Sequence, residues 1–166
     1  QRPSSRGIIM TVKITKPEID IREKLTELDG KQDKLLIRPA FSCASSGTYT
    51  ATTNAQNLST FVQSQTVSLN AGGHLVGGKF TAPIDGLYHF DLKASAVFSS
   101  GYLLLYIYKN GAPMTNHSIY FYQTSNSDTL SFTIYAQAGD YFEPYTNTNY
   151  AGGAISSLLF SGHYIG

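Results

Sequence analysis

The sequence predicts an all-β domain of the sandwich or jelly-roll class, preceded by a short N-terminal helix. From Phe41 onward apolar and polar side chains alternate, and turns rich in Gly, Asn and Asp separate the alternating runs. Residues 1–39 hold most of the charged side chains, whereas all twelve Tyr and all nine Phe come later. This shift in composition predicts a tail and helix over residues 1–38 and a β domain over residues 39–166.

Residues 15–35 carry the helix signals. Thr15, followed three positions later by Glu18, fits a capping box. Apolar residues seven apart indicate one seam of a short coiled coil: Ile14, Ile21, Leu28 and Leu35. The second seam is poor, because it offers only Leu25, and Gly30 costs about 1 kcal/mol relative to Ala. We interpret the segment as an oligomerising stalk; the alternative is a solvated helix or tail that packs against nothing.

Alternation predicts the strands of the body. Residues 87–96 place aromatic and aliphatic side chains on one face and polar ones on the other, which indicates one buried face. Residues 130–137 and 160–165 alternate in the same way. Residues 102–108 are apolar or aromatic on both faces, so we expect their second face to meet something other than water.

Composition excludes several classes of protein. A net charge of +1 gives no electrostatic case for nucleic acid. The single cysteine, Cys43, is expected to be a buried thiol, and the alternative is a disulfide between chains. No run of 18 apolar residues occurs, so no membrane insertion is expected. The opening QRPSSRG fits a mature secreted product or a trimmed chain.

Three blocks occur in a fixed order in the body: FTAPIDGLYHF with a preceding Asn, then LYIYKNG, then LSFTIYAQAGDYF followed by LLFSGHYI. Together they resemble the globular head of complement component one, subcomponent q, in the tumour-necrosis-factor-like superfamily. The residues that match this pattern, and that we expect to define the fold, are Asn70, Phe80, Gly86, Tyr88, Phe90, Gly139, Phe160 and Gly162.

The resemblance implies a ten-stranded jelly roll that forms a compact homotrimer and is secreted. A charged segment, rather than a collagen-like repeat, precedes the head, which favours an invertebrate or soluble member without a collagen stalk. Tyr-rich strands suit a chain that buries one sheet against its neighbours, because Tyr combines apolar area with a polar tip. Two glycosylation sequons, at Asn57 and Asn116, would matter in a secreted protein.

No set of residues has catalytic spacing, so we expect no enzyme. We expect His89 to lie on the surface beside Asp91; the alternative for His117 and His163 is a metal held with their symmetry mates. Relatives often bind calcium near the trimer apex, and the acidic loop candidates here are Asp85, Asp128, Asp140 and Glu143. For Asp140 we favour a structural Gly-Asp turn instead.

The expected recognition site is residues 143–153, EPYTNTNYAGG, interpreted as a loop. Its candidate side chains are Tyr145, Asn147, Asn149 and Tyr150. Rigid aromatics beside adaptable amides suit neutral ligands such as sugars. His74, in a glycine-rich loop, is a further candidate, and the alternative is an ordinary polar loop.

These observations predict a secreted, trivalent, lectin-like protein of innate immunity that binds carbohydrate or microbial surface patterns through its head loops. The alternatives are a matrix protein whose head is a trimerisation device, and a cytokine-like ligand for a cell-surface receptor.

Overall fold

The computed structural model describes residues 21–36, 38–45, 47–63, 66–97, 101–122, 126–149 and 153–166. The chain divides into two compact units, Gln1–Leu35 and Leu36–Gly166. In the first, α1 (Ile21–Leu36) exposes three apolar side chains at heptad spacing, Ile21, Leu25 and Leu28. Ile14 and the predicted capping box lie outside the described residues, and the coiled coil stays a prediction.

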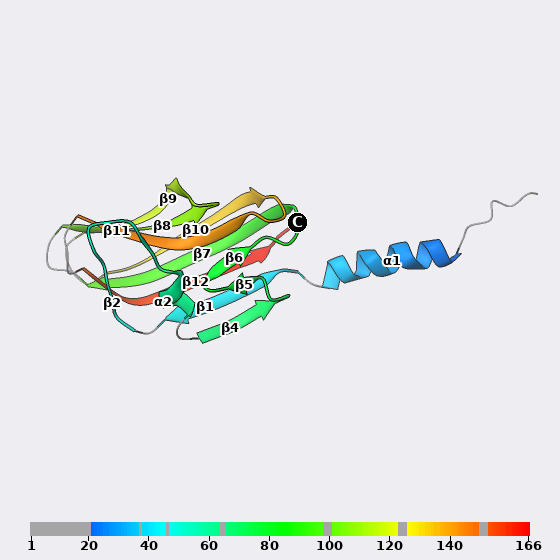
Figure 1. Cartoon of the computed structure of the whole chain (residues 1–166), viewed down its shortest axis with the longest axis horizontal. Helices are drawn as coiled ribbons and strands as arrows, with labels where there is room; N and C mark the ends of the chain where they lie inside the picture. The colour runs from blue at the N-terminus through cyan, green and yellow to red at the C-terminus, as the bar shows by residue number, and fades with distance from the viewer. Residues whose placement is uncertain are drawn as a thin grey trace, which may run out of the picture. The chain divides into compact units, whose positions relative to one another are not determined.

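The second unit is a sandwich of two antiparallel sheets (Figure 1). The first, which we call the β7 sheet, contains in spatial order β10 (Asn126–Ala136), β7 (Gly86–Val97), β12 (Ala154–Tyr164), β1 (Ala40–Ser45) and β4 (Thr66–Ala71), with β2 (Tyr49–Thr50) beside β12. The second, the β8 sheet, contains β5 (Leu75–Val76), β6 (Lys79–Thr81), β11 (Tyr141–Thr148), β8 (Tyr102–Lys109) and β9 (Ala112–Tyr122), with β3 (Gln56–Asn57) beside β11. A short helix, α2 (Ser59–Gln63), links β3 to β4. The all-β jelly-roll prediction is confirmed.

The core between the sheets is a cluster of phenylalanines. The strand register aligns Phe41, Gly162, Phe90 and Phe132 in one row across the β7 sheet. The Phe90 ring centroid lies 4.5 Å from that of Phe142, which belongs to the opposite sheet. A Cβ on Gly162 would lie 2.7 Å from the Phe90 ring and 2.8 Å from the Phe41 ring. Gly162 therefore leaves the space in which the two flanking rings pack.

Side chains of the family pattern also fix the turns. Asn70 closes the turn between β4 and β5, because its amide nitrogen donates to the Leu75 carbonyl (2.9 Å) and its amide oxygen accepts from the Leu75 N–H (3.0 Å). The buried Tyr88 donates its hydroxyl to the Ile84 carbonyl, 2.8 Å away. Gly86 has φ of +150°, and a Cβ there would lie 2.4 Å from the Tyr164 ring. Each contact ties a turn to the strand that follows it or packs on it.

A charged cluster holds the turn between β10 and β11, where Gly139 also lies. Asp140 accepts from the Asn110 amide (2.7 Å) and the Gln137 N–H (2.9 Å), and Lys109 Nζ lies 2.7 Å from its Oδ2. The Lys109 hydrogen bond, aided by those of Asn110 and Gln137, lowers the pKa of Asp140 to about 2. Asp140 thus has the structural turn role that we favoured over calcium binding.

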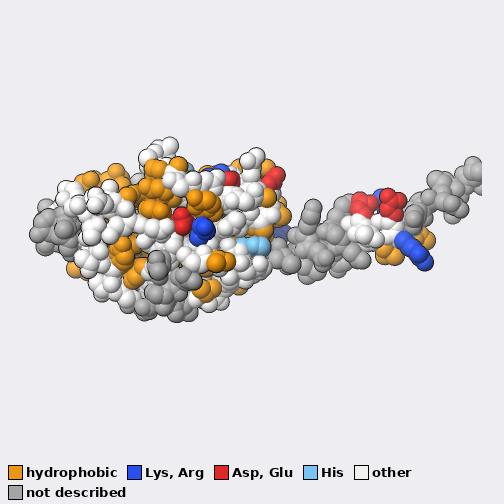
Figure 2. All heavy atoms as spheres, viewed as in Figure 1, with side chains coloured by type: hydrophobic (Ala, Val, Ile, Leu, Met, Phe, Trp, Pro, Cys, Tyr) orange, Lys and Arg blue, Asp and Glu red, His pale blue; other side chains and the backbone are white. Residues whose placement is uncertain are grey.

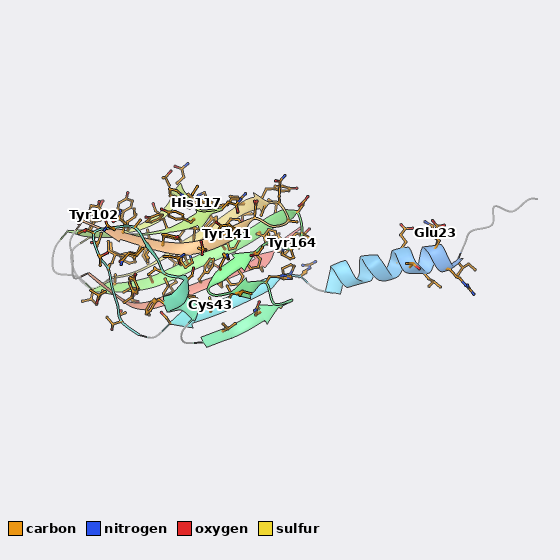
Figure 3. The ribbon with its side chains drawn as sticks, viewed as in Figure 1. Glu23, Cys43, Tyr102, His117, Tyr141 and Tyr164 are labelled. Carbon is orange, nitrogen blue, oxygen red and sulfur yellow. The ribbon has the colours of Figure 1, made fainter. Side chains whose placement is uncertain are left out.

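Cys43 is fully buried, and its thiol donates to the Phe160 carbonyl, 3.3 Å away (Figure 3). Burial raises the pKa of this thiol to about 12. A buried, protonated thiol matches the first expectation for Cys43 and gives no support to an interchain disulfide.

We expect Gly162→Ala to lower the free energy of unfolding by about 1–3 kcal/mol, because the added methyl group overpacks the phenylalanine row. Urea unfolding followed by tyrosine fluorescence measures this. Gly166→Ala is the matched control, since a Cβ there meets nothing within 4 Å. Equal stability of the two variants would contradict the packing described for Phe90.

We expect the Asp140 contribution to stability to be present above about pH 4 and lost as the pH falls toward 2, because the folded-state pKa is depressed. Asp140→Asn should cost about 1 kcal/mol at pH 7 and weaken the stability change between pH 4 and 2. Urea unfolding across this pH range tests it. Asp128→Asn, which changes a carboxylate bonded to the adjacent Thr129 N–H, serves as the control.

Candidate functional site

The outward side of the β8 sheet is rich in tyrosine, and we call it the outer aromatic face. Paired residues on antiparallel strands point to the same side of a sheet. The registers of β11, β8 and β9 therefore give four rows on this face: Glu143–Tyr108–Pro113, Tyr145–Tyr106–Ser118, Asn147–Leu104–Tyr120, and Tyr102–Tyr122. The other side of β8 is the core side, where Leu103, Leu105 and Ile107 are fully buried.

Strand β9 bulges away from β8 in the middle of this face. Tyr106 pairs with Ser118 and Tyr108 pairs with Pro113, so a single β8 residue, Ile107, lies opposite the four residues 114–117 of β9. His117 of β9, labelled in Figure 3, packs its ring on Phe132 of β10, with ring centroids 4.4 Å apart. Met114 packs against the core. The bulge is thus anchored at its first and last residues.

The bulge leaves a groove, which we call the β9 groove. It has a volume of about 250 Å³ and is lined by Leu104, Tyr106, Tyr108, Pro113, Thr115, Ser118 and Tyr120. Figure 2 shows hydrophobic side chains gathered where Figure 1 draws β8 and β9. The sequence predicts that the second face of residues 102–108 meets something other than water. The groove on that face is consistent with this prediction.

Stacked tyrosines support the groove floor. The rings of Tyr108 and Tyr145 stack with centroids 3.7 Å apart, and Tyr106 lies 5.5 Å from Tyr108. Tyr106 is only 7% exposed, and burial followed by the neighbouring Tyr108 raises the pKa of Tyr106 to about 12. The Asn57 amide donates to the Tyr145 hydroxyl (3.2 Å) and to Glu143 (3.1 Å). The floor is therefore held by contacts from β11 and β3, on the side of β8 away from β9.

The prediction that residues 143–148 form a loop is wrong, because they belong to β11, which pairs with β8 from Phe142 to Thr148. Phe142, Pro144, Thr146 and Thr148 alternate inward, and the polar composition concealed this two-faced pattern. Tyr145 and Asn147 consequently point to the outer aromatic face. Asn149 follows the strand and accepts from the Tyr102 N–H (2.7 Å), while Tyr150 lies outside the described residues.

The other candidate residues lie on separate elements. His74 is half-buried in the turn between β4 and β5, and its carbonyl accepts from the Thr81 N–H. Asp85 accepts from the Ala138 N–H (2.7 Å), and Glu143 is bonded to Asn57. Within the described part of the chain, no three His, Cys, Asp or Glu side chains form a group that could hold a metal. The four acidic calcium candidates lie on different segments: Asp85 in the turn before β7, Asp128 on β10, Asp140 in the turn before β11 and Glu143 on β11.

The remaining predicted residues lie on the surface. His89 lies 3.4 Å from Asp91, as expected, and 3.1 Å from the Thr133 hydroxyl, while its ring faces that of His163 at 5.4 Å. Of the two sequons, Asn57 has its amide bonded within the β3–β11 network, whereas Asn116 is exposed on the β9 bulge. Sequence reasoning missed the β9 groove; its only signal was the two-sided apolar character of residues 102–108.

Comparison with known proteins places the head in a family, since the C1q domain model matches residues 40–165. The chain belongs to the C1q domain family. A search of curated protein sequences gave no significant match. No described helix combines the length and apolar character needed to cross a membrane.

Solved structures share the fold of this C1q domain. The globular domain of zebrafish complement 1qA protein is 24% identical, with a TM-score of 0.55, over 77% of this chain and 98% of that one. Murine APRIL is 8% identical, with a TM-score of 0.58, over 77% and 99%. The PRD1 vertex protein P5 is 14% identical, with a TM-score of 0.57, over 78% and 99%. At these identities the likeness concerns the fold alone.

Nitration by tetranitromethane should separate the tyrosines of the C1q domain by exposure and pKa, because the reagent attacks the accessible phenolate. We expect rapid modification of Tyr120 and Tyr122, which are 50% and 64% exposed, and slow modification of Tyr106. Peptide mass spectrometry measures this, with the fully buried Tyr88 as the unreactive control. Fast nitration of Tyr106 would contradict its place in the groove floor.

Proposed function

We propose that this C1q domain is a secreted, non-enzymatic recognition module that assembles as a homotrimer and binds carbohydrate or microbial surface patterns in innate immunity. The observation that carries the proposal is that the two outward faces of the sandwich differ in their side chains. The β7 sheet offers a broad face suited to self-association, and the β8 sheet offers a tyrosine-rich face suited to ligands.

The outward face of the β7 sheet combines small side chains, mostly Ser and Ala on β1, with His89, Asp91 and Lys93 on β7. One row across it reads Leu69–Ser42–Ser161–Asp91–Ser131, and the next reads Ala40–His163–His89–Thr133. Small side chains let the backbone of another copy approach closely, and apolar residues at the borders, Val67, Leu69, Leu87 and Tyr135, are 43–55% exposed. Interfaces between copies of one chain are more apolar than the rest of the surface, so these exposed apolar side chains support association through this face.

The helix α1 supports the same assembly. Ile21, Leu25 and Leu28 are 70%, 53% and 58% exposed, and their spacing of four and then three residues is that of a coiled-coil seam. An isolated helix of this length is marginal in water, so association of three copies would stabilise it.

Trivalency supplies the mechanism of recognition. Association through the β7 sheet leaves the outer aromatic face of each copy available to a ligand. A single weak site becomes useful when three equivalent sites meet a repetitive surface, because the second and third contacts form at a high effective concentration.

We expect the full chain, and the chain lacking residues 1–38, both to have three times the mass of one chain in sedimentation or light scattering. Ser42→Arg, on β1 of the β7-sheet face, should reduce this mass to that of a monomer. Thr53→Arg, in an exposed loop, is the matched control. A head that is monomeric without substitution would contradict the trimer.

Recognition is tested separately, by a glycan array and by binding of the labelled trimer to whole microbes. We expect binding on at least one of the two, with apparent affinity about 10²–10⁴-fold above that of the monomeric Ser42→Arg variant. If the trimer binds neither the glycan array nor whole microbes, the recognition function is contradicted, and assembly is left as the role of the head.

A further inference from the structure

We propose that the β9 groove is the ligand site of this domain and that it takes the ring of a neutral hexopyranose. This inference rests on the proposed recognition function and deepens it, since it names the site and the chemical class of ligand. It also moves the site from the predicted loops to the surface of a sheet.

The shape of the groove matches one sugar ring. Leu104, Tyr106 and Tyr108 form an apolar and aromatic floor, and Pro113 and Thr115 line the opposite wall on β9. A pyranose presents a face of C–H bonds that packs on such a floor. The volume of about 250 Å³ is just below the usual range for drug-sized ligands, about 300–1,000 Å³, and so suits one ring rather than a long chain.

The polar groups at the groove match a sugar rather than a hydrocarbon. Thr115, Ser118 and Tyr120 bring hydroxyls to the groove lining, and a hydroxyl both donates and accepts hydrogen bonds. Sugar hydroxyls have the same dual capacity. A purely apolar ligand would leave these groups unpaired, which costs binding free energy.

The charge around the groove selects a neutral ligand. None of the seven lining residues is charged. On the same face the Glu143 carboxylate accepts from Asn57, and the nearby Lys109 ammonium is held by Asp140. An anionic sugar would therefore find no free cation among these residues, and a cationic ligand would find no free carboxylate.

The floor is rigid before any ligand arrives. Tyr108 is stacked on Tyr145, whose hydroxyl accepts from Asn57, and Tyr120 is stacked on Tyr122 with centroids 5.9 Å apart. Ordering of side chains is a large cost in binding, and aromatic rings already fixed by stacking avoid most of it.

Titration of the full chain with the methyl glycosides of glucose, galactose, mannose and N-acetylglucosamine tests the proposal, with glucuronic acid and N-acetylneuraminic acid as anionic probes. Saturation-transfer NMR detects binding, and tyrosine fluorescence reports on the groove because the chain has no Trp. We expect at least one neutral sugar to bind with a Kd on the order of 1 mM, and no comparable binding of the two acids.

Two variants locate the site. Tyr120→Ala removes a half-exposed ring at the groove, and Thr115→Arg fills the groove from an exposed position. Each should raise the Kd at least about tenfold. Val76→Ala is the control, because it removes an exposed apolar side chain from β5, outside both the groove lining and the β7-sheet face.

Three results would overturn the inference: no binding of any neutral sugar, binding that both groove variants leave unchanged, or binding of the acids alone. A change of solution mass in Tyr120→Ala would also overturn it, since a second copy would then fill the groove. If the trimer binds microbes and both groove variants bind them equally well, this inference is wrong, but the proposed function still stands.

Discussion

The close approach of Phe90 and Phe41 over Gly162 is the constraint on which the rest of the structure depends. The two rings lie in one row of the β7 sheet with no side chain between them, and Phe90 reaches Phe142 of the facing sheet. This contact sets the spacing of the two sheets in the centre of the sandwich. Because the inward positions are filled by this packing, the alternate positions of every strand are fixed outward. The packing of the core therefore determines which side chains form the two outward faces.

The two outward faces differ in chemistry although they are built on the same plan. On the outward side of the β7 sheet, Ser and Ala predominate on β1 and the polar His89, Asp91 and Lys93 lie on β7, whereas tyrosines occupy the β8 sheet. Under the proposed function, the first face would contact other copies and the aromatic face with its groove would bind a ligand. Because the faces lie on opposite sides of one sandwich, the proposed assembly and the proposed recognition would not compete for the same residues.

The sequence was sufficient for the fold class and the family, and insufficient for the site. Alternation identified the strand of residues 87–96, and the ordered blocks identified the family, because both signals are local in the chain. Residues 143–148 were read as a loop since their Asn and Thr composition resembles one, yet pairing with β8 makes them a strand. Tyr145 and Asn147, predicted as ligand-binding residues of a loop, lie on the outward side of this strand. The β9 groove depends on a register shift between two strands, and register is a property of pairing that composition does not contain.

The β9 bulge has a consequence for how this domain can change over evolution. Residues 114–117 are the unpaired part of β9, and the ladder with β8 resumes unchanged at Pro113 and Ser118. Met114 packs against the core, and the His117 ring packs on Phe132 of β10. Residues 115 and 116 are thus free to vary in size and chemistry without altering the sheet or the opposite face. Related copies of this gene could acquire different ligands at the bulge while keeping the same quaternary structure.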